Sequence, residues 1–231
     1  MSEEVEVVPL RAVHLDRAVD AVARAFLDDP MWSCVLPDRG VRDVALRPMW
    51  RALVGFARVY GEALTTPGGE GAACWIRPGK TRTTLWMVLR TGLGLPRAIV
   101  RLPRDARERF FTMMRFIDER HRLVMSGPHW YLWVLGVAPE VQRRGIGRAL
   151  LRPILDRADA TGVSCYLETQ TEGNVAFYRE CGFDVIDEQN EPVCGLPIWF
   201  MRRIARSLEQ GSETATDRSS ARSCVRRGVR G

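Results

Sequence analysis

The chain has 231 residues, of which 46% are hydrophobic and 27% carry a charge. These proportions exclude a chain that is disordered throughout, and the length fits one domain with a substantial core. The net charge of +6 comes from 34 basic and 28 acidic residues. Such a charge suits a polyanionic cofactor, a nucleic acid or an anionic membrane, so charge alone selects no class of partner.

The cysteines and the apolar segments predict where the protein resides. Six cysteines, at positions 34, 74, 165, 181, 194 and 224, form no C-x-x-C pair, which favours reduced, mostly buried thiols and no metal site. The N-terminus, MSEEVE, has no basic segment followed by an apolar one, so no signal peptide is expected. The most apolar stretch, residues 85–102, is broken by arginines, glycines and a proline and is too interrupted to span a membrane. The sequence predicts a cytoplasmic protein without a membrane anchor.

The N-terminal third alternates between strand and helix patterns. It predicts an edge strand, two helices and a hairpin, over residues 5–10, 14–26, 41–59 and 60–77. Residues 80–122 follow as helical stretches interrupted by glycine and proline, with basic side chains on one side. The other side carries the large apolar residues Trp86, Met87, Phe110, Met113, Met114 and Phe116. Apolar positions at helical spacing are usually core, so we expect this segment to cover a sheet face.

Residues 130–161 are the most informative stretch. An apolar run over residues 131–137 predicts a strand buried on both faces, and Pro139 ends it. The loop QRRGIG at 142–147 follows, and then apolar residues recur at helical spacing to residue 158. A helix N-terminus has unpaired backbone N–H groups and a partial positive charge, so this loop predicts an anion site, with pyrophosphate as the obvious ligand.

The sequence of this loop does not match either of two common phosphate-binding motifs. The NTPase phosphate loop requires a lysine after its second glycine, and none is present here. The dinucleotide fingerprint requires G-x-G-x-x-G, but Leu150 stands where the third glycine would be.

The C-terminal part predicts the remaining strands and a tail. Residues 164–170 predict a parallel strand, and Asn174 is expected to cap a short helix that ends at Gly182. The last two strands are expected at 183–187 and 198–204. Residues 207–231 are polar, mildly basic and poor in apolar side chains, which predicts a disordered tail after a single domain over 1–206.

The pattern Q/R-x-x-G-x-G/A at 142–147, followed by CYLETQ at 165–170 and NVAFYRECGF at 174–183, resembles the GNAT superfamily of acyl-CoA-dependent N-acyltransferases. The resemblance is strong from about residue 129 to residue 204. Within the family it is most similar to the bacterial puromycin N-acetyltransferase-like subgroup, down to Pro153 inside the long helix. It implies an α/β fold with a mixed central sheet split into a V, acetyl-CoA as co-substrate, and a helical insertion at about 80–122 that helps build the acceptor pocket.

The resemblance also assigns the cofactor-binding residues. It implies that the glycine loop holds the pyrophosphate of coenzyme A and that the pantetheine arm lies in the V. The loop residues are Gln142, Arg143, Arg144, Gly145, Ile146, Gly147 and Arg148. Backbone N–H groups at Leu135, Gly136 and Val137 would stabilise the oxyanion, and Asn174 would contact the pantetheine or the adenylate.

Tyr178 stands at the family's general-acid position, and a phenol is protonated at neutral pH and can donate to a thiolate. The general base is left open. Glu168 acts as base if its side chain points into the slot, or is a surface carboxylate paired with an arginine. His129 precedes the central strand and has a suitable pKa, but also fits a plain strand end. His14 and His121 have no supporting context.

These residues predict an enzyme that transfers an acetyl group from acetyl-CoA to a primary amine of a small molecule, such as an antibiotic or a metabolite. The alternative is a catalytically silent acyl-CoA sensor. Nucleic-acid binding through the arginines of 80–122 is a third possibility, but no recognised module supports it. The resemblance also suggests a homodimer.

Overall fold

The computed structural model describes residues 5–80 and 94–206. The predicted tail, and the part of the predicted insertion that contains Trp86 and Met87, lie outside these residues. Within them, no helix is long and apolar enough to cross a membrane.

A seven-stranded sheet forms the centre of the molecule, in the order β1-β2-β3-β4-β5-β7-β6. The strands are β1 (Val8–Pro9), β2 (Gly61–Thr65), β3 (Gly71–Ile76), β4 (Trp130–Val137), β5 (Cys165–Thr169), β6 (Asp184–Asn190) and β7 (Pro197–Arg203). Strands β4 and β5 pair in parallel, and the other neighbouring strands pair antiparallel. The predicted mixed sheet is confirmed, although its edge strand is shorter than the sequence pattern predicts.

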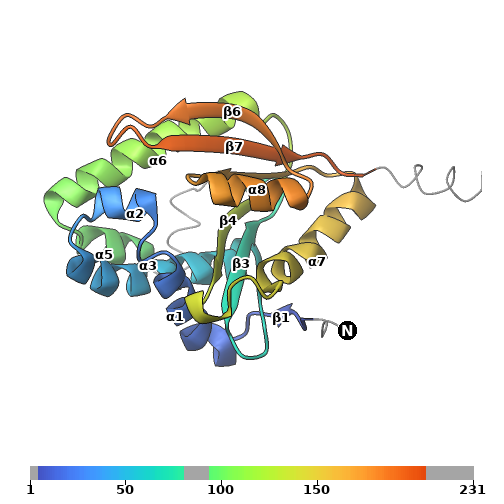
Figure 1. Cartoon of the computed structure of the whole chain (residues 1–231), viewed down its shortest axis with the longest axis horizontal. Helices are drawn as coiled ribbons and strands as arrows, with labels where there is room; N and C mark the ends of the chain where they lie inside the picture. Colours follow the sequence, from blue (N-terminus) through green and yellow to red (C-terminus); the bar gives the residue numbers. More distant parts are fainter. Residues whose placement is uncertain (1–4, 81–93, 207–231) are drawn as a thin grey trace, which may run out of the picture.

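Two groups of helices cover the sheet (Figure 1). They are α1 (Leu15–Ala25), α2 (Pro30–Val35), α3 (Arg39–Tyr60), α5 (Gly94–Val100), α6 (Arg104–Val124), α7 (Ile146–Thr161) and α8 (Glu172–Glu180), with short 3-10 turns at Ala12–His14 and Pro139–Val141. Side chains from α1, α2, α3, α5 and α6 form one core cluster, and those from α7 and α8 form a second one. The sheet separates these two cores, so the face of the sheet from which a strand residue's side chain projects decides which core that side chain joins.

Local capping explains where two of the first helices begin. Asp29 and Asp38 stand just before α2 and α3, and their carboxylates accept hydrogen bonds from the backbone N–H groups of Trp32 and Val41. Such a carboxylate satisfies one unpaired N–H of the first turn. The sequence pattern of residues 28–32 indicates only a break, because a six-residue helix is too short to show periodicity.

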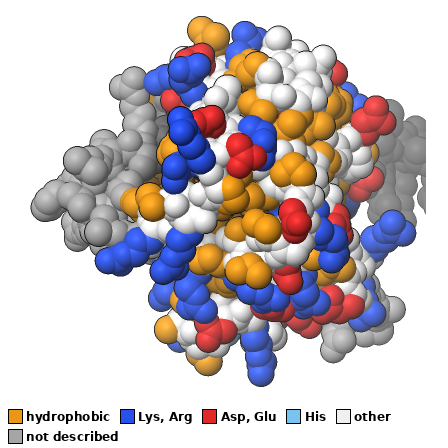
Figure 2. Space-filling view, turned by 90° about the vertical axis from the view of Figure 1, so that its left-hand side faces the viewer, with side chains coloured by type: hydrophobic (Ala, Val, Ile, Leu, Met, Phe, Trp, Pro, Cys, Tyr) orange, Lys and Arg blue, Asp and Glu red, His pale blue; other side chains and the backbone are white. Residues whose placement is uncertain are grey.

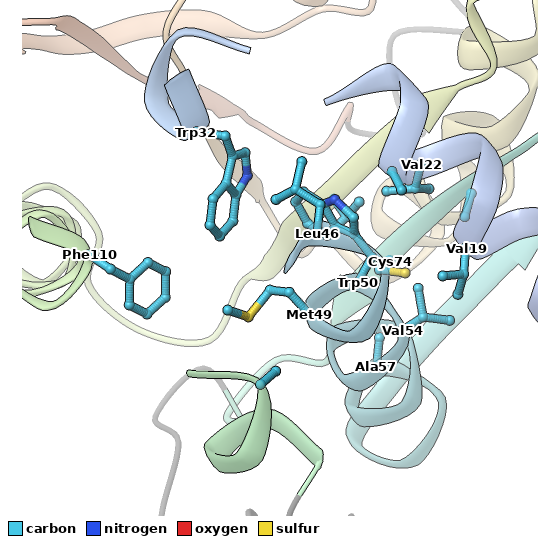
Figure 3. Close-up of a cluster of buried hydrophobic side chains, with 14 of the residues drawn as sticks. Val19, Val22, Trp32, Leu46, Met49, Trp50, Val54, Ala57, Cys74 and Phe110 are labelled. Carbon is cyan, nitrogen blue, oxygen red and sulfur yellow. The ribbon is translucent and has the colours of Figure 1, made fainter. Parts of the chain in front are cut away.

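The larger core gathers aromatic side chains between α2, α3 and α6. Trp32, Met49 and Phe110 point toward one another from these three helices (Figure 3). The ring of Trp32 stacks on Phe110 with centroids 5.8 Å apart and meets Trp50 edge-on at 5.6 Å. Phe110 and Met113 are therefore core residues, as expected for the apolar face of this segment.

Several arginines of α6 form ion pairs with acidic residues on the same helix. Arg104 pairs with Glu108, and Arg122 pairs with Asp118, each one helical turn apart. Figure 2, which shows the side of the molecule nearest α2, α5 and α6, has acidic side chains among the basic ones. The basic side predicted for this segment is thus interleaved with carboxylates rather than a continuous positive stripe.

The sheet splits between β4 and β5. The two strands pair only at their first residues, Trp130 with Cys165 and Tyr131 with Tyr166. Figure 1 shows the consequence, because β3 and β4 run steeply across the view while β6 and β7 lie across its top. The predicted V is therefore present, and it opens toward the C-terminal ends of β4 and β5.

A β-bulge changes which faces of β4 are buried. Val134 pairs with Cys74 and Leu132 with Trp75, so Trp133 is the extra residue. Side chains at Tyr131 and Val134 join the larger core, although they are three residues apart in a strand. Leu132 and Leu135 of the same strand join the smaller core, so both faces of β4 are covered, and this explains the continuous apolar run.

Two sequence predictions are wrong. Thr171, not Asn174, caps α8, because its hydroxyl accepts a hydrogen bond from the Asn174 backbone N–H at 3.2 Å. Cys34 of α2 and Cys194 of the β6–β7 turn form a disulfide across 160 residues, so the expectation of reduced thiols fails for this pair. Their separation hides the pairing in the sequence, because only the folded β6–β7 turn brings them together.

Candidate active site

The slot between β4 and β5 is the first component of the site. Leu135, Gly136 and Val137 pair with β3 along one edge of β4, and no described strand pairs with their other edge. An added side-chain carbon at Gly136 would lie 3.1 Å from Phe26 and 3.2 Å from Val22 of α1. A glycine here lets α1 pack directly on β4, which fixes the wall of the slot.

The glycine loop is the second component, and it leads from the end of β4 into α7. Arg143 has φ 62° and Gly145 has φ 82°, a left-handed conformation that favours glycine. No side chain of the described residues caps the N-terminus of α7, and its first turn holds no acidic residue. The unpaired N–H groups of this turn therefore remain available to an anion.

Side chains around the loop divide into two kinds. Gln142, Arg143 and Arg144 are exposed. The guanidinium groups of Arg143 and Arg144 form no ion pair with a described residue. Gln142 donates from its side-chain amide to the Val137 carbonyl at 2.9 Å, which ties the loop to β4. Ile146 is buried in the smaller core, so only its backbone faces the loop.

Two other predicted loop residues contact α8. Arg148 forms an ion pair with Glu180 at 2.5 Å, so in this structure its charge is directed at α8 and not at the loop. A side-chain carbon added at Gly147 would lie 3.4 Å from the ring of Phe177. The second glycine thus permits close packing of α7 against α8.

Helix α8 carries Asn174 and Tyr178 on different sides. Asn174 is exposed and donates its side-chain amide to the Thr169 hydroxyl at 3.0 Å, which places it beside the end of β5. Tyr178 is buried in the smaller core, where its ring meets Phe177 and Phe183 edge-on. Burial raises the pKa of Tyr178 well above its usual range, so the phenol stays protonated.

Glu168 lies on the face of the sheet opposite to Tyr178. It stands in β5 two residues after Tyr166, which forms the last pair between β4 and β5. Its side chain is only 8% exposed, so the alternative of a surface carboxylate is wrong. The Tyr131 hydroxyl donates to Glu168 Oε2 across the narrow end of the slot at 2.8 Å. Burial raises the pKa of Glu168 to about 7, although the hydrogen bond from Tyr131 lowers it in part.

Two histidines complete the environment of Glu168. His121 Nδ1 lies 4.0 Å from Glu168 Oε1, and the two imidazoles meet with 2.8 Å between the Nε2 atoms of His121 and His129. The His121 ring stacks on Tyr166 at 4.1 Å. Both histidines are buried, so their ring nitrogens require partners within the protein.

Sequence reasoning missed His121, although a signal was present. Phe110, Met113, Ile117 and His121 recur at helical spacing and are the buried face of α6. A histidine on an otherwise apolar helix face requires a buried polar partner, and here the partner is His129, directly before β4, with Glu168 of β5 nearby.

One group of possible metal ligands occurs within the described residues: Cys34, Glu191 and Cys194. Its two sulfurs are bonded to each other. Both Glu191 oxygens accept backbone N–H groups of the β6–β7 turn, including those of Val193 and Leu196. This carboxylate therefore organises a turn.

A parallel strand pair that splits, with an uncapped helix N-terminus beside the opening, offers a slot and an anion site that fit an acyl-CoA. The sequence comparisons agree with it. Residues 107–183 match the model of the acetyltransferase (GNAT) family. Residues 107–183 are therefore similar to the GNAT acetyltransferases, and the chain is an enzyme of the acetyl-CoA-dependent acyltransferase class.

Individual relatives span different parts of the chain. An uncharacterised N-acetyltransferase of Schizosaccharomyces pombe is 27% identical over 173 residues, which cover 72% of this chain and 69% of that protein. The N-alpha-acetyltransferase RimI of Mycobacterium tuberculosis is 39% identical over 87 residues, 36% of this chain and 54% of RimI. The crystal structure of "histone acetyltransferase HPA2 and related acetyltransferase" from Corynebacterium glutamicum matches with a TM-score of 0.60 at 20% identity, covering 89% of this chain and 99% of that one. The structural likeness concerns the fold.

Proposed function

We propose that the protein transfers the acetyl group of acetyl-CoA to a primary amine of a small molecule. The observation that carries this proposal is the position of Glu168. It is a buried carboxylate at the narrow end of the slot, beside the last paired residues of β4 and β5. Its raised pKa near neutrality suits a group that removes a proton from an amine.

The described residues fit acetyl-CoA, which supplies an acetyl group activated as a thioester. The uncapped first turn of α7, with Gly145 and the exposed Arg143 and Arg144, would hold the pyrophosphate. The unpaired edge of β4 at Leu135 to Val137 would pair with the amides of the pantetheine arm. A backbone N–H on that edge would stabilise the negative charge that develops on the thioester oxygen.

The acid and the base stand on opposite faces of the sheet. Tyr178 belongs to the core under α7 and α8, on the side of the glycine loop, and would donate its proton to the departing thiolate. Glu168 faces the cluster with His121 and Tyr131, and would take the proton of the amine there. This division lets the cofactor and the acceptor enter from opposite sides of the slot.

The identity of the acceptor follows from the family only in part. A small-molecule amine is our first choice because of the sequence's resemblance to the puromycin N-acetyltransferase-like subgroup. A peptide amine is the second choice, because the RimI relative is named for N-alpha acetylation. That match spans 36% of this chain, so it bears on one part of the domain.

The test is release of free thiol from acetyl-CoA over a panel of amines that includes puromycin, polyamines, amino acids and short peptides. Each amine is paired with its N-acetylated form, which has the same shape and no free amine. Release that requires the free amine supports the enzyme and identifies its acceptor class. Binding of acetyl-CoA without release for any amine would instead support an acyl-CoA sensor.

A further inference from the structure

The hydrogen bonds of His129 fix the protonation of both buried histidines. His129 Nδ1 lies 2.9 Å from the carbonyl oxygen of Gly127, and a carbonyl only accepts, so Nδ1 carries a proton. In a neutral imidazole the other nitrogen then accepts. The partner at 2.8 Å is His121 Nε2, which must donate. His121 Nδ1 is left with a lone pair that faces Glu168.

No hydrogen bond joins His121 to Glu168, and the buried hydroxyl of Tyr166, which has no partner at hydrogen-bonding distance in the described part of the chain, lowers the pKa of Glu168 from the same side. Glu168 Oε1 is buried and has no hydrogen-bond partner among the described residues, and it lies 4.0 Å from His121 Nδ1. A lone pair therefore faces a carboxylate oxygen. One added proton would let the two groups form a hydrogen bond after a small side-chain movement, because such bonds span about 2.8 Å.

The surrounding charges favour neutral histidines. Burial, the neighbouring His129 and Arg122 of α6 together lower the pKa of His121 to about 3, and burial lowers that of His129. Asp118 of α6 raises the pKa of Glu168 further. The remaining neighbours of the cluster are the phenols of Tyr131 and Tyr166, and Asp187 of β6, which pairs with Arg120. Both imidazoles are thus uncharged at neutral pH.

We propose that His121 and His129 form a relay that carries the proton taken up by Glu168 to the exposed turn at Gly127. This inference rests on the proposed function. Glu168 Oε1–H gives its proton to His121 Nδ1, His121 gives its Nε2 proton to His129 Nε2, and His129 releases its Nδ1 proton to water at the turn. Each imidazole gains one proton and loses one, Glu168 is again a carboxylate, and both rings return to their starting tautomers before the next turnover.

The relay gives the enclosed Glu168 a route by which it can release its proton. Glu168 is enclosed by the cluster, while the thioester and the amine would meet in the slot beside it. A route through α6 and the start of β4 lets the base release its proton without admitting water to the slot. Residues 126–128 are exposed, so the route ends at solvent. His121 and His129 are positioning residues, because they act through Glu168.

The test uses His129→Ala, which leaves a space of imidazole size beside an exposed turn. We expect kcat with the best amine to fall by about tenfold or more, within the range of a general base, while KM for acetyl-CoA stays unchanged. Added 4-methylimidazole can accept and donate a proton, and should restore kcat in a saturable way. The isomer 1-methylimidazole has the same size but its second nitrogen is blocked, and should not restore it.

Equal rescue by both isomers would overturn the relay and leave a packing role, as would a kcat within about twofold of the wild type. Should His129→Ala not fold, His121→Asn decides the question. Its amide oxygen keeps an acceptor near Nδ1 but cannot pass a proton on, so the relay predicts a loss of kcat and a purely structural role predicts none. Absence of amine-dependent turnover in the wild-type protein would refute the proposed function instead.

Discussion

Replacing Glu168 with glutamine should make the protein more stable at alkaline pH and less active. The substitution keeps the shape of the side chain and an oxygen that accepts from the Tyr131 hydroxyl. It removes only the ionisation of a buried group. A residue kept for catalysis at the expense of stability behaves in this way.

The magnitude follows from the raised pKa of this carboxyl group. Burial raises the pKa of Glu168 from 4.5 to about 7, and a pKa difference of one between the folded and the unfolded chain corresponds to about 1.4 kcal/mol. Below pH 4.5 the carboxyl is protonated in both the folded and the unfolded chain, so its ionisation contributes nothing. As the pH rises to about 7 and above, only the folded state must ionise a buried group, which costs about 3 kcal/mol. Glutamine removes that cost.

The assay is urea unfolding of wild-type and Glu168→Gln protein at about pH 4.5 and about pH 8. We expect nearly equal free energies of unfolding at the lower pH and an advantage of about 3 kcal/mol for the variant at the higher one. Glu188→Gln, at an exposed position of β6, serves as the control and should show no such pH dependence. An advantage for Glu168→Gln that is equal at both pH values would refute the reasoning.

Further predictions concern the acid, the loop, the pH profile and the disulfide. Tyr178→Phe should lower kcat and leave acetyl-CoA affinity unchanged by calorimetry; unchanged turnover would remove Tyr178 from the mechanism. Gly145→Val should weaken acetyl-CoA binding, while Gly162→Val, at the other end of α7 with φ 67° and equally open space, carries similar backbone strain and should bind normally. In the wild type, kcat/KM should rise with pH through about 7 as Glu168 ionises, and a flat profile would argue against this base. Reduction of the Cys34–Cys194 bond should lower the free energy of unfolding by up to about 5 kcal/mol, the chain-entropy value for a loop of 160 residues. The double alanine variant should no longer respond to the reductant, and a response would mean that the reductant acts elsewhere.

The central strand, loop and helix could be predicted because their signals are local. Glycine at position 145 reflects a left-handed backbone angle at that residue, and the helix after it shows its own apolar periodicity. The split of the sheet could be predicted only from the family resemblance. The extra residue at Trp133 appears only in the pairing of β4 with β3.

The surroundings of Glu168 could not be predicted, because they depend on contacts between distant segments. His121 comes from α6 and Tyr166 from β5, and no spacing in the chain relates them. The same holds for the disulfide, whose cysteines are 160 residues apart. Asn174 resembles a cap in the sequence because it begins the recognised motif, while the hydroxyl that caps the helix stands three residues earlier at Thr171.

Calorimetric titration of the wild-type protein with acetyl-CoA tests the central claim most directly. We expect saturable binding of one molecule per chain, weakened by raised salt because the pyrophosphate would meet exposed arginines and a helix N-terminus. Desulfo-coenzyme A, which keeps the pyrophosphate and lacks the thioester, should still bind. Absence of binding by both ligands would contradict the assignment of the slot and the glycine loop.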